Sequence, residues 1–358
     1  MQTAIEAFHE RINSVRAIIG AKDLTAVVIR RNPNLAWLVA GRAHVPTTID
    51  AACFDLIITA SNITAVTNII EGPRLIAEEL PAEIDVIQIP WWEGRDPKLP
   101  TGESIGSDQP GGGRVDIGVE IEIARSSLTE FDCSRYKSIS QDASQALGAV
   151  MKGVSQEDRE IDVAGKIAQA LWSADLEIAF LGVAGERRCQ LFRHPLPTED
   201  LVGNRVVASI CAKRKGLIAS VTRIVSFEPW SDEYEGQYQG LLNVEAAMLD
   251  ATLVGSPFSA PVNGASTSYG QNGFDETEWH CHHQGGPTGY LPRDWPATPS
   301  SARLISLNQP VAWNPTGKGW KAEDTWLTTQ EGPRLLSVDP NWPTRTVAGR
   351  ARPEVLPL

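Results

Sequence analysis

The spacing of apolar residues near the start of the chain predicts an amphipathic helix. Ile5, Phe8, Ile12, Val15 and Ile19 recur every three or four residues. This spacing places all five side chains on one face of a helix. The chain therefore begins with a helix that needs a partner surface to cover its apolar face.

Short continuous apolar runs follow this helix, and they predict strands. We expect strands at 25–29, 35–39, 55–59 and 84–89, and a helix over 74–80. Strands separated by short helices are typical of a small α/β domain.

A polar segment over 93–114 separates this domain from the rest of the chain. It is rich in Pro, Gly, Ser and Asp, which is typical of a loop or linker. The glycines at 111–113 are not followed by a Lys-Ser pair, so we do not interpret them as a phosphate-binding loop. We place the domain boundary between Glu93 and Ser127, with an N-terminal domain over 1–120 and a second domain over 127–358.

Longer helices and longer strands are predicted after Ser127. A helix is expected over 128–150, and Val154–Asp158 has the pattern of a capping box that opens a second helix. The apolar stripe of that second helix is Ile161, Ala164, Ile167 and Leu171. The remaining expected elements are strands at 178–181, 205–211 and 217–227, a hairpin turn at 213–216, a helix at 241–253 and short strands within 302–337.

Composition narrows the range of partners and the cellular location. A formal net charge of −12 and the lack of a basic stripe argue against nucleic-acid binding. No apolar run approaches the roughly 20 residues of a membrane span, and the first residues do not resemble a signal peptide. Five widely spaced cysteines indicate free thiols in a reducing compartment, so we expect a cytoplasmic protein without membrane contact.

Seven of the 11 tryptophans follow residue 229, which predicts an aromatic-walled cavity or a large core in the second domain.

The most distinctive stretch for chemistry is Glu278–Gly286, which holds three of the six histidines. A His/Cys cluster can bind a borderline or soft metal ion. The alternative is a strand that leads into a glycine turn. Alternation along a strand would send His280 and His282 to one face and Cys281 and His283 to the other. In that geometry the side chains cannot converge on one ion, and a single histidine faces a pocket built elsewhere.

Five short motifs occur along the chain in the order Arg193-His194-Pro195, Thr222-Arg223, the His-rich stretch with Gly285-Gly286, Trp313-Asn314-Pro315 and Glu323-Asp324-Thr325. In this order they resemble the creatinase, prolidase and methionine aminopeptidase superfamily with its pita-bread fold. The resemblance covers nearly the whole chain and implies an α/β (α+β) protein, with a small N-terminal α/β domain and a curved, mainly antiparallel sheet covered by helices.

The resemblance also assigns the positions at which metallopeptidases of this superfamily hold two metal ions. These enzymes use two aspartates, a histidine and two glutamates, and the positions correspond here to Ser209, Ser220, His283 (or His282), Asn314 and Glu323. Hydroxyls and an amide are poor substitutes for carboxylates around two divalent ions. We therefore expect no metal and no other cofactor.

Creatinase, a member without metal, implies an acid–base site instead. The resemblance makes His194 the proton-shuttling residue, His283 an orienting or polarising residue, and Glu323 a group that binds a cation or aligns water. A histidine suits proton transfer near neutral pH. The expected substrate-binding residues are Arg193, Arg223, His282, Tyr290, Asn314 and Arg42.

The implied function is hydrolysis of a C–N bond in a small molecule, in a homodimer in which Arg42 reaches a partner's pocket. A metal-free lyase, isomerase or cyclase in the same pocket is an alternative, and so is a non-catalytic pseudo-peptidase that binds a ligand or partner. The residues have simpler alternatives too. Arg223 is also typical of a structural ion pair in a hairpin, and His194 could simply end a strand.

Overall fold

The computed structural model describes residues 2–43, 51–109, 111–229 and 231–358. The chain forms two compact units, Met1–Cys133 with Lys215–Leu217, and Ser134–Arg214 with Ile218–Leu358. The change from the first unit to the second falls within the long helix α5 (Glu130–Met151), after the linker to which the sequence assigns the boundary. Within the described residues, no helix is both long and apolar enough to cross a membrane.

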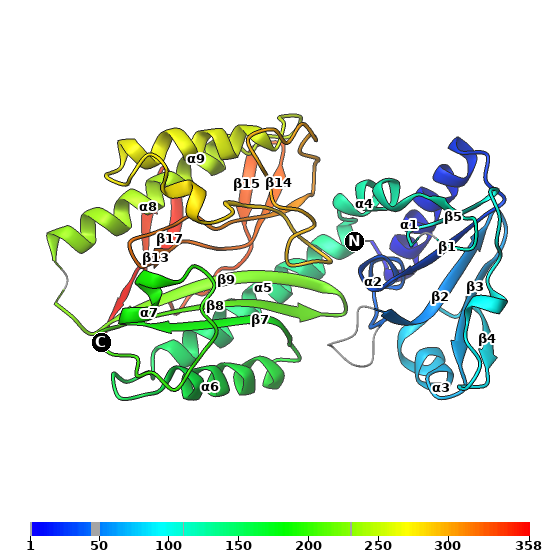
Figure 1. Ribbon diagram of the computed structural model, residues 1–358, viewed down its shortest axis with the longest axis horizontal. Helices are drawn as coiled ribbons and strands as arrows, with labels where there is room; N and C mark the ends of the chain where they lie inside the picture. The colour runs from blue at the N-terminus through cyan, green and yellow to red at the C-terminus, as the bar shows by residue number, and fades with distance from the viewer. Residues whose placement is uncertain (1, 44–50, 110, 230) are drawn as a thin grey trace. The chain divides into compact units, whose positions relative to one another are not determined.

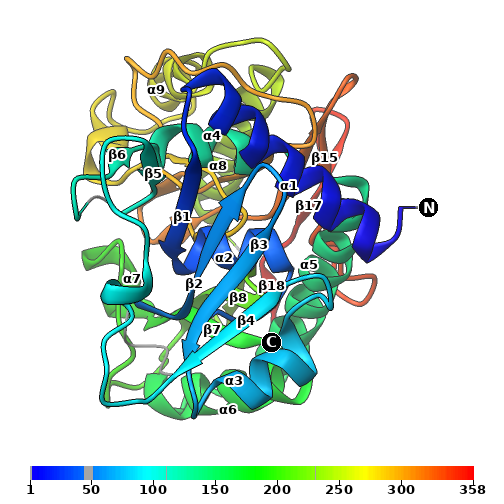
Figure 2. The ribbon, with the colours of Figure 1, turned by 90° about the vertical axis from the view of Figure 1, so that its right-hand side faces the viewer.

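A mixed six-stranded sheet forms the centre of the first unit, and Figure 2 faces its strands. Neighbouring strands β1 and β2, and β2 and β3, run antiparallel, whereas β3–β4, β1–β5 and β5–β6 are parallel pairs. The strands expected near 25–29, 55–59 and 84–89 are confirmed, and β3 was not predicted. In sheet order the strands are β4 (Asp85–Ile89), β3 (Ile63–Asn68), β2 (Ala51–Thr59), β1 (Ala26–Arg31), β5 (Ile105–Ser107) and β6 (Val115–Asp116).

The predicted first helix is α1 (Ala4–Ala21), and its apolar stripe is buried apart from the exposed Ile5. Thr3 and Glu6 form a capping box that satisfies backbone N–H groups at its start. Helices α2 (Asn32–Val39) and α4 (Gly118–Ser126) pack beside it.

The strand expected at 35–39 is wrong, because these residues form the last turns of α2. Pro33 lies in the first turn of this helix, where its fixed φ and missing N–H are tolerated. Every residue from Pro33 to Val39 is buried, so the apolar run shows no helical period. A buried strand and a buried helix have the same apolar pattern over such a short length. The helix expected over 74–80 is present as α3 (Gly72–Arg74) and a single π-helical turn, η1 (Leu75–Glu79).

The second unit is built from helices on two sides of curved strands, as Figure 1 shows. Helix α5 and helix α6 (Glu160–Ser173) lie on one side, and α8 (Asp232–Asp250) and α9 (Ser259–Gln271) lie together on the other. The helices expected over 128–150 and 241–253 are confirmed, although α8 begins nine residues earlier than expected. Helix α9 was not predicted.

The capping box expected at 154–158 does not open α6. The backbone N–H of Ser155 donates to the Asp158 carboxylate at 2.9 Å and closes a turn, and α6 begins only at Glu160. Val163, Ala164, Ile167 and Leu171 form the buried face, while Ile161 is exposed. The predicted helix is therefore real, but its start was placed too early.

Strands of the second unit form several small sheets, and the hairpin β8 (Arg205–Arg214) and β9 (Leu217–Ser226) is the longest part. Its two-residue turn has positive φ at both Lys215 (45°) and Gly216 (88°), as a tight hairpin requires. This confirms the expected hairpin. The other strands are β7 (Glu177–Gly185), β18 (Leu356–Pro357), β10 (Gly285–Pro287), β11 (Pro310–Trp313), β14 (Trp326–Thr329), β15 (Gly332–Leu335), β12 (Thr316–Gly317), β13 (Trp320–Lys321), β16 (Thr344–Val347) and β17 (Arg350–Pro353).

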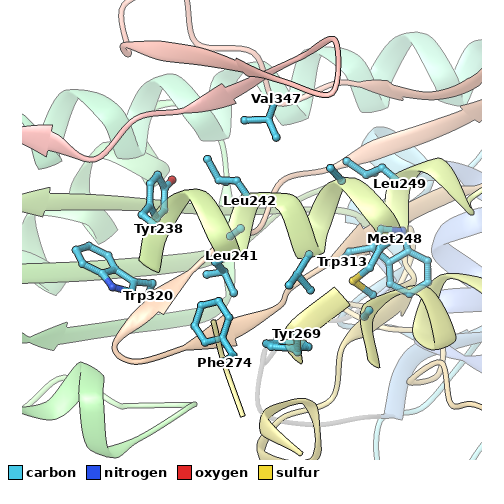
Figure 3. Close-up of a cluster of buried hydrophobic side chains, with 14 of the residues drawn as sticks. Tyr238, Leu241, Leu242, Met248, Leu249, Tyr269, Phe274, Trp313, Trp320 and Val347 are labelled. Carbon is cyan, nitrogen blue, oxygen red and sulfur yellow. The ribbon is translucent and has the colours of Figure 1, made fainter. Parts of the chain in front are cut away.

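Aromatic side chains fill the core between α8, α9 and the strands, as Figure 3 shows. Trp313, Trp320 and Trp326 are almost completely buried there. The tryptophan-rich second half therefore builds a large core. Trp320 also lines a small cavity, so both uses that the sequence suggested are present.

Candidate functional site

Three histidine side chains from two distant segments of the second unit converge. His194 follows the short helix α7 (Glu186–Leu191), and His282 and His283 precede β10. The Nε2 atoms of His194 and His282 are 2.9 Å apart, within hydrogen-bond distance. The rings of His282 and His283 stack at 4.3 Å, and the ring of His283 lies 5.3 Å from that of His194. We call these three residues the triple-histidine cluster.

The backbone around Glu278 explains why the cluster forms. Glu278–Cys281 is a turn of 3-10 helix, η3, and only His282 enters extended backbone, with φ −154° and ψ 147°. The strand expected over this stretch is therefore wrong, and the alternation derived from it does not apply. Instead of facing opposite sides, His282 and His283 both lie against His194, while His280 and Cys281 are exposed.

The surroundings favour neutral imidazoles in this cluster. Burial lowers the pKa of His282 to about 2 and that of His283 to about 4, and nearby cations act in the same direction. The pKa of the more exposed His194 is also lowered, first by partial burial and then by Lys321. Neutral rings at neutral pH each keep one nitrogen with a lone pair, which can accept a proton or bind an ion.

The hairpin β8–β9 presents a row of small polar side chains on one face. The Ser209 hydroxyl lies 2.8 Å from that of Thr222, and the Ser220 hydroxyl lies 3.5 Å from the sulfur of Cys211. Alternation along a strand puts residues two apart on the same face. Ser209 and Ser220, which the resemblance assigns to ligand positions, therefore share one face of the hairpin.

Glu323 lies against this face and is held by protein cations. Its Oε2 accepts from Lys321 Nζ at 2.8 Å and from the Thr222 hydroxyl at 3.2 Å. Its Oε1 accepts from the guanidinium of Arg293. Burial alone would raise the pKa of Glu323, but Lys321 and Arg293 outweigh burial and lower the pKa to about 2. Both carboxylate oxygens are thus already paired within the protein.

Arg293 and Lys321 were missed in the sequence analysis. Arg293 also donates to the Ser220 hydroxyl at 3.3 Å, so its guanidinium links Ser220 to Glu323. The sequence contains one signal for Lys321, a cation two residues before Glu323 in a strand-like segment, where both side chains point to one face. Arg293 lies 30 residues from Glu323, and no pattern in the sequence connects them.

The low pKa of Glu323 predicts that this residue makes the protein sensitive to acid. Its folded-state pKa of about 2 lies below the ordinary value of 4.5. The unfolded chain therefore binds more protons between these values. The stability that Glu323 contributes is complete above about pH 4.5 and is lost as the pH falls toward about 2.

Urea unfolding at several pH values between about 6 and 3 measures this effect. The unfolding free energy of the unmodified protein should fall more steeply with acid than that of Glu323→Gln, whose side chain does not titrate. The matched control is Glu157→Gln, because Glu157 is exposed. Equal slopes for the unmodified protein and Glu323→Gln would contradict the assigned ion pairs.

A small cavity of about 30 Å³ adjoins the site. Arg193, Ser209 and Lys321 contribute its polar wall, and Phe180 and Trp320 contribute apolar surface. This volume corresponds to about one water molecule. The side chain of Arg193 pairs with Glu278 of η3, which fixes the arginine at the edge of the cavity.

Two further predicted residues lie within the second unit. Asn314 is buried, and its side-chain Oδ1 has no hydrogen-bond partner within the described residues. Its backbone N–H donates to the carbonyl of Gln284, which ties Asn314 to the segment that follows the histidines. Tyr290 is buried in the loop after β10.

Arg223 is not brought to the cluster, which corrects its expected role in binding a substrate. It follows Thr222 on β9, so alternation turns it to the opposite face of the hairpin. There it is 3% exposed and donates to the Asp324 carboxylate at 3.2 Å and to the Ser144 hydroxyl at 2.6 Å. A buried, paired arginine is not available to a substrate. Arg223 therefore forms a structural ion pair, which is the alternative role that the sequence suggested.

Arg42 belongs to the first unit and pairs there with Glu79 at 2.9 Å. Arg74 binds the same carboxylate at 3.2 Å. In the structure, the side chain of Arg42 therefore forms an ion pair with Glu79 within its own unit. Its expected contribution to a partner's pocket stays a prediction.

The residues at the ligand positions do not fit a pair of divalent metal ions. Two are hydroxyls and one is an amide, and the remaining carboxylate, Glu323, is neutralised by Lys321 and Arg293. Divalent ions of this kind need several anionic oxygens in the first coordination sphere.

Comparisons with solved structures identify close similarity in fold. The prolidase from Pyrococcus horikoshii OT3 aligns with a TM-score of 0.77 and 16% identity over 92% of this chain and 98% of its own. The Xaa-Pro dipeptidase from Bacillus anthracis aligns with a TM-score of 0.77 and 14% identity over 98% of this chain and 100% of its own. The N-terminal domain of the FACT complex subunit SPT16 from chickpea aligns with a TM-score of 0.68 and 11% identity, over 94% and 95% of the two chains. The sequence itself matches no protein-family model and no curated protein. The similarity to these solved structures confirms the expected fold class.

Proposed function

From the premise that this chain has the pita-bread fold of the creatinase, prolidase and methionine aminopeptidase superfamily, we propose that it is a metal-independent, creatinase-like hydrolase. Its substrate is a small molecule with a C–N bond, such as an amide or amidine. The active site is the triple-histidine cluster together with Glu323, Lys321 and Arg293. The domain that carries it is the pita-bread domain over 127–358.

The observation that carries this proposal is the ion-paired triad of Lys321, Glu323 and Arg293. A dinuclear metallopeptidase uses metal cations beside its carboxylates to stabilise negative charge on the reacting oxygen. Here Lys321 and Arg293 lie beside Glu323, and the triad of these three side chains carries a net positive charge. Fixed cations can stabilise a developing oxyanion in the same way, because they need no reorganisation during the reaction.

His194 is the residue that moves the proton. It is the exposed member of the cluster, and its Nε2 already lies 2.9 Å from that of His282. Water attacks the carbon, its proton passes to His194, and the C–N bond breaks as His194 returns the proton to the leaving nitrogen. His282 and His283 orient the ring of His194, which is a positioning role.

Glu323 has a different role from the one the sequence suggested. Its two oxygens are occupied by Lys321, Thr222 and Arg293, so it does not bind a cationic substrate or activate water. It positions the two cations instead. Arg193 lines the cavity but pairs with Glu278, so it would have to leave that partner to bind a substrate carboxylate. The homodimer and the cytoplasmic location remain predictions.

A substrate screen tests the proposal. The full-length protein is incubated with small amides, amidines and N-methyl amino acids, and released amine or ammonia is measured. We expect turnover of at least one class, and we expect His283→Ala to lower it strongly. Turnover that His283→Ala leaves unchanged would contradict the assigned site.

A non-catalytic binding role is the competing function. The SPT16 domain with the same fold is named as part of a complex and not as an enzyme. If no compound in the screen is turned over while a compound still raises the unfolding temperature, the binding role would replace hydrolysis.

A further inference from the structure

We propose that the triple-histidine cluster is an inhibitory binding site for one transition-metal ion of the Zn²⁺ class. Within the described residues, His194, His282 and His283 form the one group of three or more metal-ligating side chains that converges in this way. A single ion on these three histidines differs from the dinuclear site of the superfamily. The two sites share one position, His283 (or His282), but the other dinuclear positions are Ser209, Ser220, Asn314 and Glu323, which are outside the cluster. The binding part of the proposal stands without the proposed function, whereas the inhibition part rests on it.

The geometry is close to what a single ion needs. One ligand nitrogen from each histidine lies within 4.8 Å of the other two, and two of them are 2.9 Å apart. Zinc binds imidazole nitrogen at about 2.0–2.1 Å in a tetrahedron, which separates ligand nitrogens by about 3.3 Å. Small side-chain rotations therefore bring the three nitrogens to bonding distance, with a fourth position left open.

The donor set selects the class of metal. Three imidazoles suit Zn²⁺, Ni²⁺ or Cu²⁺, whereas Mg²⁺ and Ca²⁺ require oxygen ligands. The nearby carboxylate of Glu323 is bound by Lys321 and Arg293, so it is not available as an oxygen ligand. The same two cations oppose a dication and favour an anion at the open fourth position. Only a metal with strong affinity for nitrogen should bind.

The exposure of the cluster and the unpartnered nitrogens of its rings also agree with metal binding. His194 is exposed, so an ion can reach the cluster from solvent, while His282 is buried and fixes the base of the site. The Nδ1 atoms of His282 and His283 have no hydrogen-bond partner among the described residues, so these nitrogens are not committed to another protein group.

A metal ion bound to the triple-histidine cluster would block the proposed reaction. A metal ion bound to His194 uses the lone pair with which His194 would accept a proton. The ion therefore acts as an inhibitor, and its removal restores activity.

Calorimetric titration of metal-stripped, full-length protein with ZnCl₂ tests the site without any substrate. We expect one saturable site per chain. His282→Ala and His283→Ala should each weaken binding by more than the roughly 10- to 100-fold that loss of an outer-shell partner costs. His280→Ala is the matched control, because His280 is exposed and lies outside the cluster. His283→Gln provides a second variant of similar size, in case the alanine variants do not fold.

The outcomes separate this proposal from the proposed function. Uptake of less than one zinc ion per chain would overturn the proposed site. Zinc binding by His283→Gln with the affinity of the unmodified protein would overturn it as well. If a substrate is found, ZnCl₂ should inhibit its turnover over the concentration range that fills the site, and EDTA should reverse the inhibition. Binding without inhibition would overturn the inhibitory role, and the absence of any turnover would contradict the proposed function while leaving the measured metal site in place.

Discussion

Replacing His194 with alanine should lower turnover by about a hundred- to ten-thousand-fold, which is the range for loss of a positioned general acid–base. The residue is exposed and its ring is oriented mainly by His282. Its removal should therefore leave the urea midpoint close to that of the unmodified protein. The loss should appear in kcat more than in KM, because His194 acts on the proton and not on substrate affinity.

The measurement is steady-state hydrolysis of whichever compound the screen identifies. His280→Ala is the control for removing a nearby histidine, and it should retain full activity. Substantial activity in His194→Ala would remove His194 from the mechanism. In that case His283 would be the remaining candidate for proton transfer.

The largest effect on stability should come from Arg352→Met. Arg352 is 2% exposed and donates two hydrogen bonds to Glu245, at 2.6 and 2.7 Å. It also pairs with Asp324 at 2.9 Å. Asp324 in turn holds Arg223. Removing one partner of a buried ion pair typically costs about 3–5 kcal/mol, because the other charge stays buried without compensation.

Urea unfolding followed by tryptophan fluorescence measures this loss, since Trp326 lies beside Arg352 and most tryptophans belong to the second unit. The unfolding free energy of Arg352→Met should fall by that amount. Arg334→Met is the control, because Arg334 is exposed on β15. Similar midpoints for the two variants would show that the buried network contributes little to stability.

The sequence predicted those elements whose apolar pattern has a clear period or is divided by a clear turn signal. Helix α1 has a stripe at three- and four-residue spacing, and the β8–β9 hairpin combines two apolar runs with a Lys-Gly turn. The run at 35–39 has no period, because every side chain is buried, and only Pro33 favours the helix that forms. Local pattern therefore sufficed for α1, where burial is one-sided, and for the hairpin, where a turn signal divides two buried runs. It failed for the buried run at 35–39, which has neither a period nor such a turn signal.

The candidate site could be predicted only in part, for a physical reason. His194 and His282 are 88 residues apart in sequence, and tertiary packing brings their Nε2 atoms to 2.9 Å. The 3-10 turn at Glu278–Cys281 changes the direction of the side chains, and a strand assumption gives the wrong geometry. Arg293 is the clearest omission, because a long-range ion pair with a buried carboxylate leaves no periodic signal in the sequence.

Turnover by metal-stripped protein tests the proposed metal-independent hydrolysis most directly. Protein is treated with chelator, elemental analysis verifies the removal of transition metals, and hydrolysis of the identified substrate is compared before and after treatment. Activity should be unchanged, or higher if zinc had occupied the triple-histidine cluster. Loss of activity on stripping, with recovery on addition of Mn²⁺ or Co²⁺, would contradict the metal-independent mechanism and restore a metalloenzyme.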